Sequence, residues 1–192
     1  MPRNTCQECM RPLNLCYCHK VQSFQNKINI ILLQHPLEID HPFNTGRICE
    51  LSFTNITTFK GEDFNEDSSL HKLIENNKVA LLFHRPEFSV IAEKGDDYSH
   101  LIVIDANWKK AKKMYFLNTF LHDLPKVSLP LNLSSKYIVR KAPKEGHYST
   151  IESIVYALNI LEEGDYSKAL DAFEYMNESQ TKFLYKQKSV KE

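Results

Sequence analysis

The sequence has little glycine, little tryptophan and no long apolar segment. It contains 5 glycines and 1 tryptophan in 192 residues, and none of the motifs GxGxxG, GxxxxGK[ST], GxSxG or HExxH. A glycine-rich phosphate loop, a dinucleotide-binding fold and a serine-hydrolase elbow are therefore disfavoured. No apolar run approaches the roughly 20 residues that cross a bilayer. Residues 1–20 also lack the apolar core of a secretory signal. We therefore expect a cytoplasmic protein with no membrane partner.

Charge is balanced overall but unevenly distributed along the chain. The sequence has 24 basic and 24 acidic residues. Residues 50–100 contain ten acids and five bases, whereas residues 101–149 contain nine bases and three acids. The second region therefore has a local net charge of about +6. A solvated surface is the ordinary explanation for such a region, and a surface that binds phosphates is the alternative.

Cysteine spacing is more specific than charge. Cys6, Cys9, Cys16 and Cys18 form the pattern C-x2-C-x6-C-x-C, which directs four thiolates to one centre and predicts a structural zinc knuckle. Disulfides are the competing explanation, but bridges across so few residues are strained and a cytosolic protein rarely keeps them. The remaining thiol, Cys49, lies in a helix-like stretch and is expected to be a small buried hydrophobe.

Beyond the cysteines, apolar stretches of strand type alternate with stretches of helical periodicity. We expect two units, a knuckle at 1–24 and an α/β domain at 25–192 with a mainly parallel sheet and helices on both faces. The expected strands are at 27–33, 79–84, 100–105, 126–131 and 136–140. The expected helices are at 44–53, 70–76, from 108 onward, 149–164 and 167–185.

The predicted helix that begins near residue 108 is amphipathic. Its apolar side is formed by positions three and four residues apart, namely Ala111, Met114, Tyr115, Asn118 and Leu121. Its other side carries Lys109, Lys112 and Lys113 next to one another. Ligands of open α/β sheets bind at the carboxyl ends of strands, and this lysine row begins just after such an end. The placement favours phosphate binding by these lysines.

Polar residues follow several of the predicted strands. Each has an ordinary structural explanation: Gln34 and His35 end a strand, Asp105 caps a helix, and Glu152 completes a capping box with Ser149. Together they form a set of candidate site residues at the loops of an α/β domain. The set comprises Gln34, His35, Pro36, Glu38, Asn44, Thr45, Asp105, Trp108, Arg140, Thr150 and Glu152.

Five separated motifs resemble those of the DTW-domain proteins. They are the paired cysteines, QHPLE with NTGR after the first strand, DANW with AxxM behind it, RxxP, and STxE, in the order of that family. The resemblance implies a tRNA-uridine aminocarboxypropyltransferase, which moves the 3-amino-3-carboxypropyl group of S-adenosylmethionine to N3 of a tRNA uridine. It also implies a SPOUT-like, knotted fold. Asn107 stands where the family has threonine, so any role that needs a hydroxyl is in doubt.

The resemblance also implies roles for the candidate residues. Asp105 is the expected catalytic base, because uridine N3 must lose its proton, and Trp108 is the expected aromatic wall for the extruded base. Arg140 suits the carboxylate of the transferred group or a tRNA phosphate. The other set members, Gln34, His35, Pro36, Glu38, Asn44, Thr45, Thr150 and Glu152, are expected to shape the pocket for S-adenosylmethionine. The lysine row and Arg11 are expected to contact tRNA, and zinc to be structural.

Two other classes remain open at this stage. One is an S-adenosylmethionine-dependent RNA methyltransferase. It would release S-adenosylhomocysteine, whereas the aminocarboxypropyltransferase would release methylthioadenosine. The other is a non-catalytic, zinc-containing RNA-binding module, which predicts tRNA binding without affinity for S-adenosylmethionine. The target uridine, the cognate tRNA and the oligomeric state do not follow from the sequence.

Overall fold

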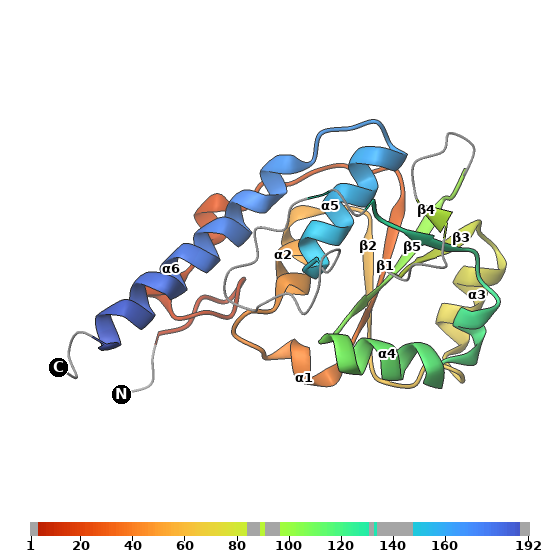
Figure 1. The fold of residues 1–192 in the computed structure, drawn as a ribbon, viewed down its shortest axis with the longest axis horizontal. Coiled ribbons are helices and arrows are strands. Elements are labelled where there is room, and N and C mark those ends of the chain that lie inside the picture. Colours follow the sequence, from red (N-terminus) through yellow and green to blue (C-terminus); the bar gives the residue numbers. More distant parts are fainter. Residues whose placement is uncertain (1–3, 84–88, 91–96, 131–132, 134–147, 189–192) are drawn as a thin grey trace.

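The fold is built on one parallel β-sheet (Figure 1). The computed structural model describes residues 4–83, 89–90, 97–130, 133 and 148–188. Within these residues, six strands lie in the order β2-β1-β5-β3-β6-β4, and every neighbouring pair is parallel. In sheet order they are β2 (Ile56–Lys60), β1 (Asn29–Gln34), β5 (His100–Asp105), β3 (Val79–Leu82), β6 (Lys126–Ser128) and β4 (Ser89–Val90).

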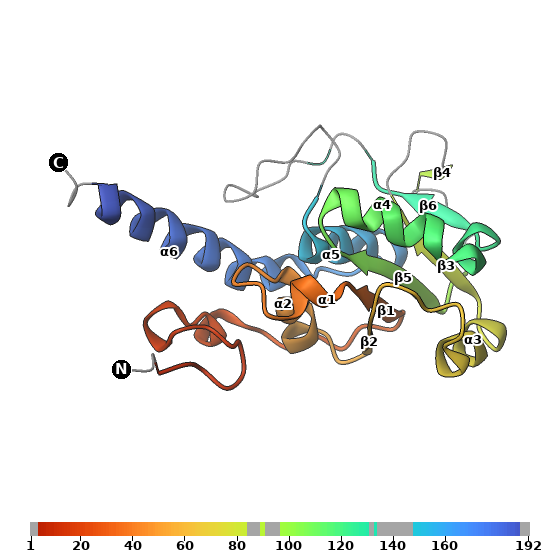
Figure 2. The same ribbon diagram turned by 90° about the horizontal axis from the view of Figure 1, so that it is seen from below.

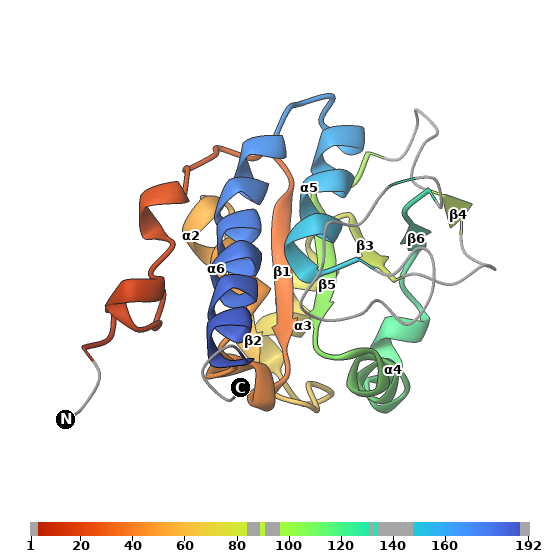
Figure 3. The same cartoon turned by 60° about the vertical axis from the view of Figure 1, so that its left-hand side comes forward.

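Helices cover both faces of the sheet, as predicted. One face packs against α2 (Thr45–Ser52), α5 (Thr150–Leu161) and α6 (Leu170–Lys188), which lie in front of the sheet in Figure 3. The other face packs against α3 (Ser68–Glu75) and α4 (Trp108–Leu117). The short helix α1 (Pro36–Ile39) directly follows β1. Four 3-10 helices complete the described elements: Leu13–Leu15, Cys18–Lys20, Thr119–His122 and Ser167–Ala169.

The hydrophobic core lies on both sides of the sheet, because successive side chains of the central strands point to opposite faces. In β1, Ile30 and Leu32 contribute to the cluster under α2, α5 and α6, whereas Ile31 and Leu33 contribute to the cluster under α3 and α4. All four side chains are fully buried. A strand that is apolar on both sides requires a cover on both faces, which explains the two helix layers.

Several predicted elements differ from those observed. The strand at 100–105 and the helix at 44–53 are confirmed as β5 and α2. The helix from residue 108 ends at Leu117, and Leu121 reaches the core from the following 3-10 helix. Strand β2 was missed, because none of its residues is fully buried and three of its five residues, ITTFK, are polar. The predicted strand at 136–140 lies outside the described residues, and the predicted knot stays a prediction.

The cysteine-rich segment packs against the rest of the protein (Figure 2). Its 3-10 helices contact α6, and the rings of His19 and Tyr175 meet edge to face at 4.6 Å. Cys9 and Tyr17 are buried in the same apolar cluster as α5 and α6. The division at residue 24 stays a prediction. Among the described helices, none has the length and apolar character needed to cross a bilayer.

Candidate active site and metal centre

Asp105 lies at the carboxyl end of β5 and is held from three elements. Gln34 ends β1 at the register position opposite Asp105, and its Nε2 donates to Asp105 Oδ2 at 2.8 Å. From the first residue of α5, Thr150 Oγ1 donates to Asp105 Oδ1 at 2.6 Å. Asp105 is only 4% exposed. Hydrogen bonds to both carboxylate oxygens fix the orientation of the group.

The third element is α2, which approaches the carboxylate through Gly46. A Cβ at position 46 would lie 2.3 Å from Asp105 Oδ2 and 2.9 Å from Gln34 Nε2. No side chain fits in that space, so glycine lets the first turn of α2 pack directly on the carboxylate.

Helix caps place these elements. Asn44 Oδ1 accepts from Arg47 N at 3.0 Å and begins α2, which brings Gly46 to the strand end. Ser149 and Glu152 form the predicted capping box of α5, which brings Thr150 to Asp105. Glu152 is fully buried, and its Oε2 accepts from the Ser149 amide and hydroxyl at 2.8 and 2.7 Å. Helix capping therefore accounts for these hydrogen bonds of Asn44 and Glu152.

His35 points to the opposite face of the sheet from its neighbour Gln34. Its Nδ1 accepts from Leu37 N at 3.0 Å, so Nε2 carries the proton and faces Glu62 Oε1 at 3.3 Å. Glu62 also pairs with Lys113 at 2.9 Å. The hydrogen bond from Lys113, with a smaller contribution from His35, lowers the pKa of Glu62. This chain of contacts joins the end of β1 to α4.

The remaining predicted pocket residues lie around the same edge of the sheet. Pro36 begins α1, and Glu38 on the same helix is 5% exposed. Thr45 is buried at the start of α2. Trp108 begins α4, which belongs to the other helix layer from Thr150, and its side chain is 36% exposed. Arg140 lies outside the described residues.

Asn107 has a clear structural role. Its side-chain oxygen accepts from Lys110 N at 3.0 Å and caps α4. Asparagine and threonine both cap helices in this way, so this role does not need a hydroxyl. Beyond the cap, Lys109, Lys112 and Lys113 are exposed, as the amphipathic pattern predicted. Lys113 is paired with Glu62, so its charge is partly balanced.

The four clustered cysteines form a thiol centre. The Sγ atoms of Cys6 and Cys18 are 3.7 Å apart, as are those of Cys9 and Cys16, and all four lie within 4.8 Å of one another. Tetrahedral zinc with Zn–S bonds of about 2.3 Å requires S···S separations of about 3.8 Å. The donor set therefore fits zinc. Backbone amides of Cys9 and Glu8 lower the pKa of Cys6 to about 6, whereas burial raises the pKa of Cys16 and Cys18, so the fit to zinc rests on the positions of the four sulfurs.

The disulfide alternative for these cysteines is wrong. All five cysteines are free thiols, and the 3.7 Å separations far exceed an S–S bond of about 2.05 Å. Cys49 is fully buried and its thiol donates to Thr45 O at 3.2 Å. Burial, with smaller contributions from Asp105 and Glu50, raises its pKa well above the usual value. Cys49 is thus an inert core residue, as expected.

Arg11 does not lie on an open RNA-facing surface. It is 4% exposed, its Nη1 donates to Pro42 O at 3.2 Å, and its guanidinium lies 5.5 Å from the centre of the Phe43 ring. The prediction that Arg11 contacts tRNA stays a prediction. The burial of Arg11 was not expected, because the contact between the loop at 40–44 and the cysteine-rich segment cannot be read from sequence spacing.

Two site residues were missed from the sequence. Gly46 touches the Asp105 carboxylate, and Glu62 joins His35 to Lys113. Gly46 offered a signal, because it lies in the motif NTGR next to the cap residue Asn44 and the chain has few glycines. Glu62 offered none, because nothing in the acidic stretch around it distinguishes it from its neighbours.

The structure thus defines an α/β protein with a polar cluster at the carboxyl edge of a parallel sheet and a cluster of four thiols that could hold a metal ion. Residues 3–181 match the DTW domain, and the chain belongs to this family. It is 30% identical over 172 residues to tRNA-uridine aminocarboxypropyltransferase 2 of Drosophila melanogaster, which covers 83% of this chain and 67% of the relative.

Two further relatives have names of the same kind. The Mus musculus tRNA-uridine aminocarboxypropyltransferase 2 is 29% identical over 174 residues, which are 85% of this chain and 58% of the relative. The Arabidopsis thaliana tRNA-uridine aminocarboxypropyltransferase A is 25% identical over 224 residues, which cover 95% and 83% of the two chains. The chain therefore spans less than two thirds of the mouse relative. No solved structure matches it.

Proposed function

We propose that this chain transfers the 3-amino-3-carboxypropyl group of S-adenosylmethionine to N3 of a tRNA uridine and releases S-methyl-5'-thioadenosine. The observation that carries the proposal is the buried Asp105 carboxylate, held by Gln34, Thr150 and the close approach of Gly46. The names of the family relatives supply the reaction class. A carboxylate oriented in this way is suited to accept a proton from a weakly acidic ring nitrogen.

The proposed step balances in protons and electrons. Asp105 accepts the N3 proton, and the N3 electron pair forms the new bond to the γ-carbon of the donor. The bond between that carbon and the sulfonium sulfur breaks, and its electrons stay on sulfur. S-adenosylmethionine supplies the electrophilic carbon and the leaving group. The protein supplies alignment and a partly dry site, which account for much of the rate of such displacements.

Other residues of the carboxyl edge have supporting roles in this proposal. Gln34 and Thr150 hold the Asp105 carboxylate in one orientation until uridine N3 arrives. Trp108, 36% exposed at the start of α4, offers a ring on which the extruded uridine stacks. Pro36, Glu38, Asn44, Thr45, Glu152 and Arg140 are proposed to shape the donor pocket, together with His35.

The remaining parts of the proposal concern zinc, tRNA and topology. The four thiolates leave no open position on zinc for a substrate, so the ion is structural.

Lys109 and Lys112 are exposed on α4 and are proposed to hold the tRNA backbone. We also propose that the parallel sheet belongs to the SPOUT-like, knotted class of folds, which is the class that the family resemblance implies.

The test is an assay with unmodified tRNA and S-adenosylmethionine, followed by mass spectrometry of the digested nucleosides and of the released small molecule. We expect aminocarboxypropyluridine together with S-methyl-5'-thioadenosine. S-adenosylhomocysteine with a methylated nucleoside would identify a methyltransferase instead. Binding of tRNA by zinc-loaded protein, without any product from a full set of tRNAs, would contradict the proposal and favour a binding module.

A further inference from the structure

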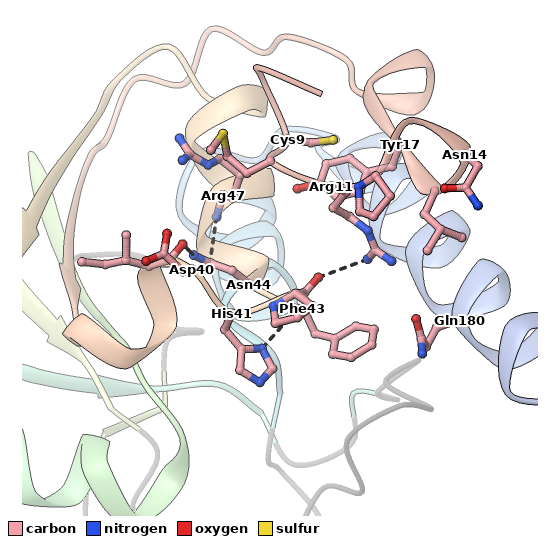
Figure 4. A pocket seen from close by; sticks show the side chains of 15 residues that line it. Cys9, Arg11, Asn14, Tyr17, Asp40, His41, Phe43, Asn44, Arg47 and Gln180 are labelled. Carbon is pink, nitrogen blue, oxygen red and sulfur yellow. Dashed lines mark hydrogen bonds between the residues drawn. The ribbon is translucent and has the colours of Figure 1, made fainter. Parts of the chain in front are cut away.

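A cavity of about 550 Å³ lies between the cysteine-rich segment, the loop that joins α1 to α2, and α6 (Figure 4). Its volume is in the range of small-molecule sites. Arg11 and Asn14 line it from the cysteine-rich segment, His41 and Phe43 from the loop, and Gln180 from α6. None of these five residues bonds to Asp105, although Asn44, which is proposed above to shape the donor pocket, also borders the cavity.

Arg11 is the unusual residue of this cavity. It is only 4% exposed, yet no carboxylate in the described part of the chain pairs with it. Only one of its donors has a protein acceptor, Pro42 O at 3.2 Å, and its Nε has no partner among the described residues. A buried guanidinium without an anion is costly, so its position points to a negative charge supplied from outside the protein or by the thiolate centre.

The other walls indicate which anion fits. Phe43 is partly exposed beside the Arg11 guanidinium, at 5.5 Å, and presents an aromatic face to the cavity. The amides of Asn14 and Gln180 make no hydrogen bond within the described residues and offer both donors and acceptors. A cation, an aromatic face and free amides together match the phosphate, the ring and the edge of one nucleotide.

The cavity is also connected to the candidate active site. Asn44, which borders it, caps α2 and so sets the position of Gly46 against Asp105. His41 and Phe43 lie in the same loop, where the His41 ring accepts from Phe43 N at 3.1 Å. A nucleotide held here would therefore contact the loop that leads into α2, the helix whose Gly46 lies against Asp105.

We propose that this cavity binds one unpaired nucleotide of the tRNA, close in sequence to the target uridine, with its phosphate on Arg11 and its base on Phe43. The proposal rests on the proposed function, because that function makes tRNA the substrate. Asn14 and Gln180 contact the base edge. The cysteine-rich segment thus contributes to substrate recognition as well as to folding.

The test measures direct binding, without turnover, on zinc-loaded protein. The variants are Arg11→Gln and the double variant Asn14→Ala with Gln180→Ala, and the matched control is Asn76→Ala on the exposed end of α3. We expect both pocket variants to raise the Kd for tRNA by roughly tenfold or more. We expect Arg11→Gln also to reduce the salt slope by about one. Zinc content and the Kd for S-adenosylmethionine should stay within about twofold.

Three results separate this proposal from its rivals. If the double variant binds tRNA as the wild type does and Arg11→Gln loses zinc, Arg11 serves only the thiolate centre and the proposal is overturned. If the Kd for S-adenosylmethionine rises instead, the cavity holds the donor and the proposal is again overturned. If the pocket variants weaken tRNA binding but the wild type forms no modified uridine, the proposed function fails and the nucleotide site stands.

Discussion

Gln34 and Asp105 occupy the same register position on neighbouring parallel strands, and the amide of one donates to the carboxylate of the other at 2.8 Å. Both side chains point to the face covered by α2 and α5, where Gly46 and Thr150 meet them. Two strand ends and two helix starts therefore fix one carboxylate. Such support from rigid elements is what a catalytic group needs for precise alignment.

Gly46→Ala tests how closely this arrangement is packed. The added Cβ would lie 2.3 Å from Asp105 Oδ2, so either the carboxylate or the start of α2 has to move. We expect kcat to fall by roughly 100-fold, because small displacements of reacting groups cost this much. We expect the free energy of unfolding to fall by about 1–3 kcal/mol. Kinetics and denaturant unfolding measure the two effects.

The control for this change is Gly164→Ala, where the nearest contact of a new Cβ is the side chain of Tyr166 at 2.8 Å. Gly164 follows the C-terminal end of α5, whereas Thr150, which bonds to Asp105, begins that helix. A similar loss of kcat in both variants would show that the effect at Gly46 comes from general destabilisation and not from Asp105.

Removal of the metal tests the thiol centre. We expect the wild type to bind about one zinc ion per chain and Cys18→Ser to lose it, because three thiolates and a hydroxyl bind zinc more weakly than four thiolates. The melting temperature should fall by about 2–4 °C for each kcal/mol of stability lost. Metal analysis and thermal unfolding measure these effects. Cys49→Ala is the matched control and should keep its zinc, because Cys49 is buried away from the cluster.

The lysine row tests the contact with tRNA. Lys109→Ala combined with Lys112→Ala should weaken tRNA binding and lower the slope of log K against log salt by about 0.9 for each phosphate that the protein no longer neutralises. Lys113→Ala should have a smaller effect, because its ammonium pairs with Glu62 at 2.9 Å. Lys72→Ala, exposed on α3, should change neither value. An unchanged slope in the double variant would place the tRNA elsewhere.

The sequence predicted the parts of the site that depend on local patterns. Asp105 and Gln34 were identified because each directly follows a buried apolar run, and Thr150 because Ser149 and Glu152 form a capping box beside it. The cysteine spacing predicted a four-thiol centre, which the structure contains. These signals lie within a few residues of chain, so they can be found without knowing the fold.

The parts that were missed depend on contacts between distant segments. The packing of Gly46 on Asp105 and the burial of Arg11 under the 40–44 loop arise from how helices and loops meet. Strand β2 was missed for a related reason. Its polar threonines are tolerated because β2 lies at the edge of the sheet, beside β1. This edge position cannot be predicted from the residues of β2 alone.

The central claim is that Asp105 accepts the uridine proton, and Asp105→Asn tests it most directly. The amide keeps the size of the side chain but cannot act as the base. In single-turnover assays with tRNA and S-adenosylmethionine, we expect the rate to fall by about 100- to 10,000-fold. The Kd for S-adenosylmethionine should stay nearly unchanged, and Asp123→Asn, exposed after α4, should react at the wild-type rate. An Asp105→Asn protein that transfers the group as fast as the wild type would contradict the account.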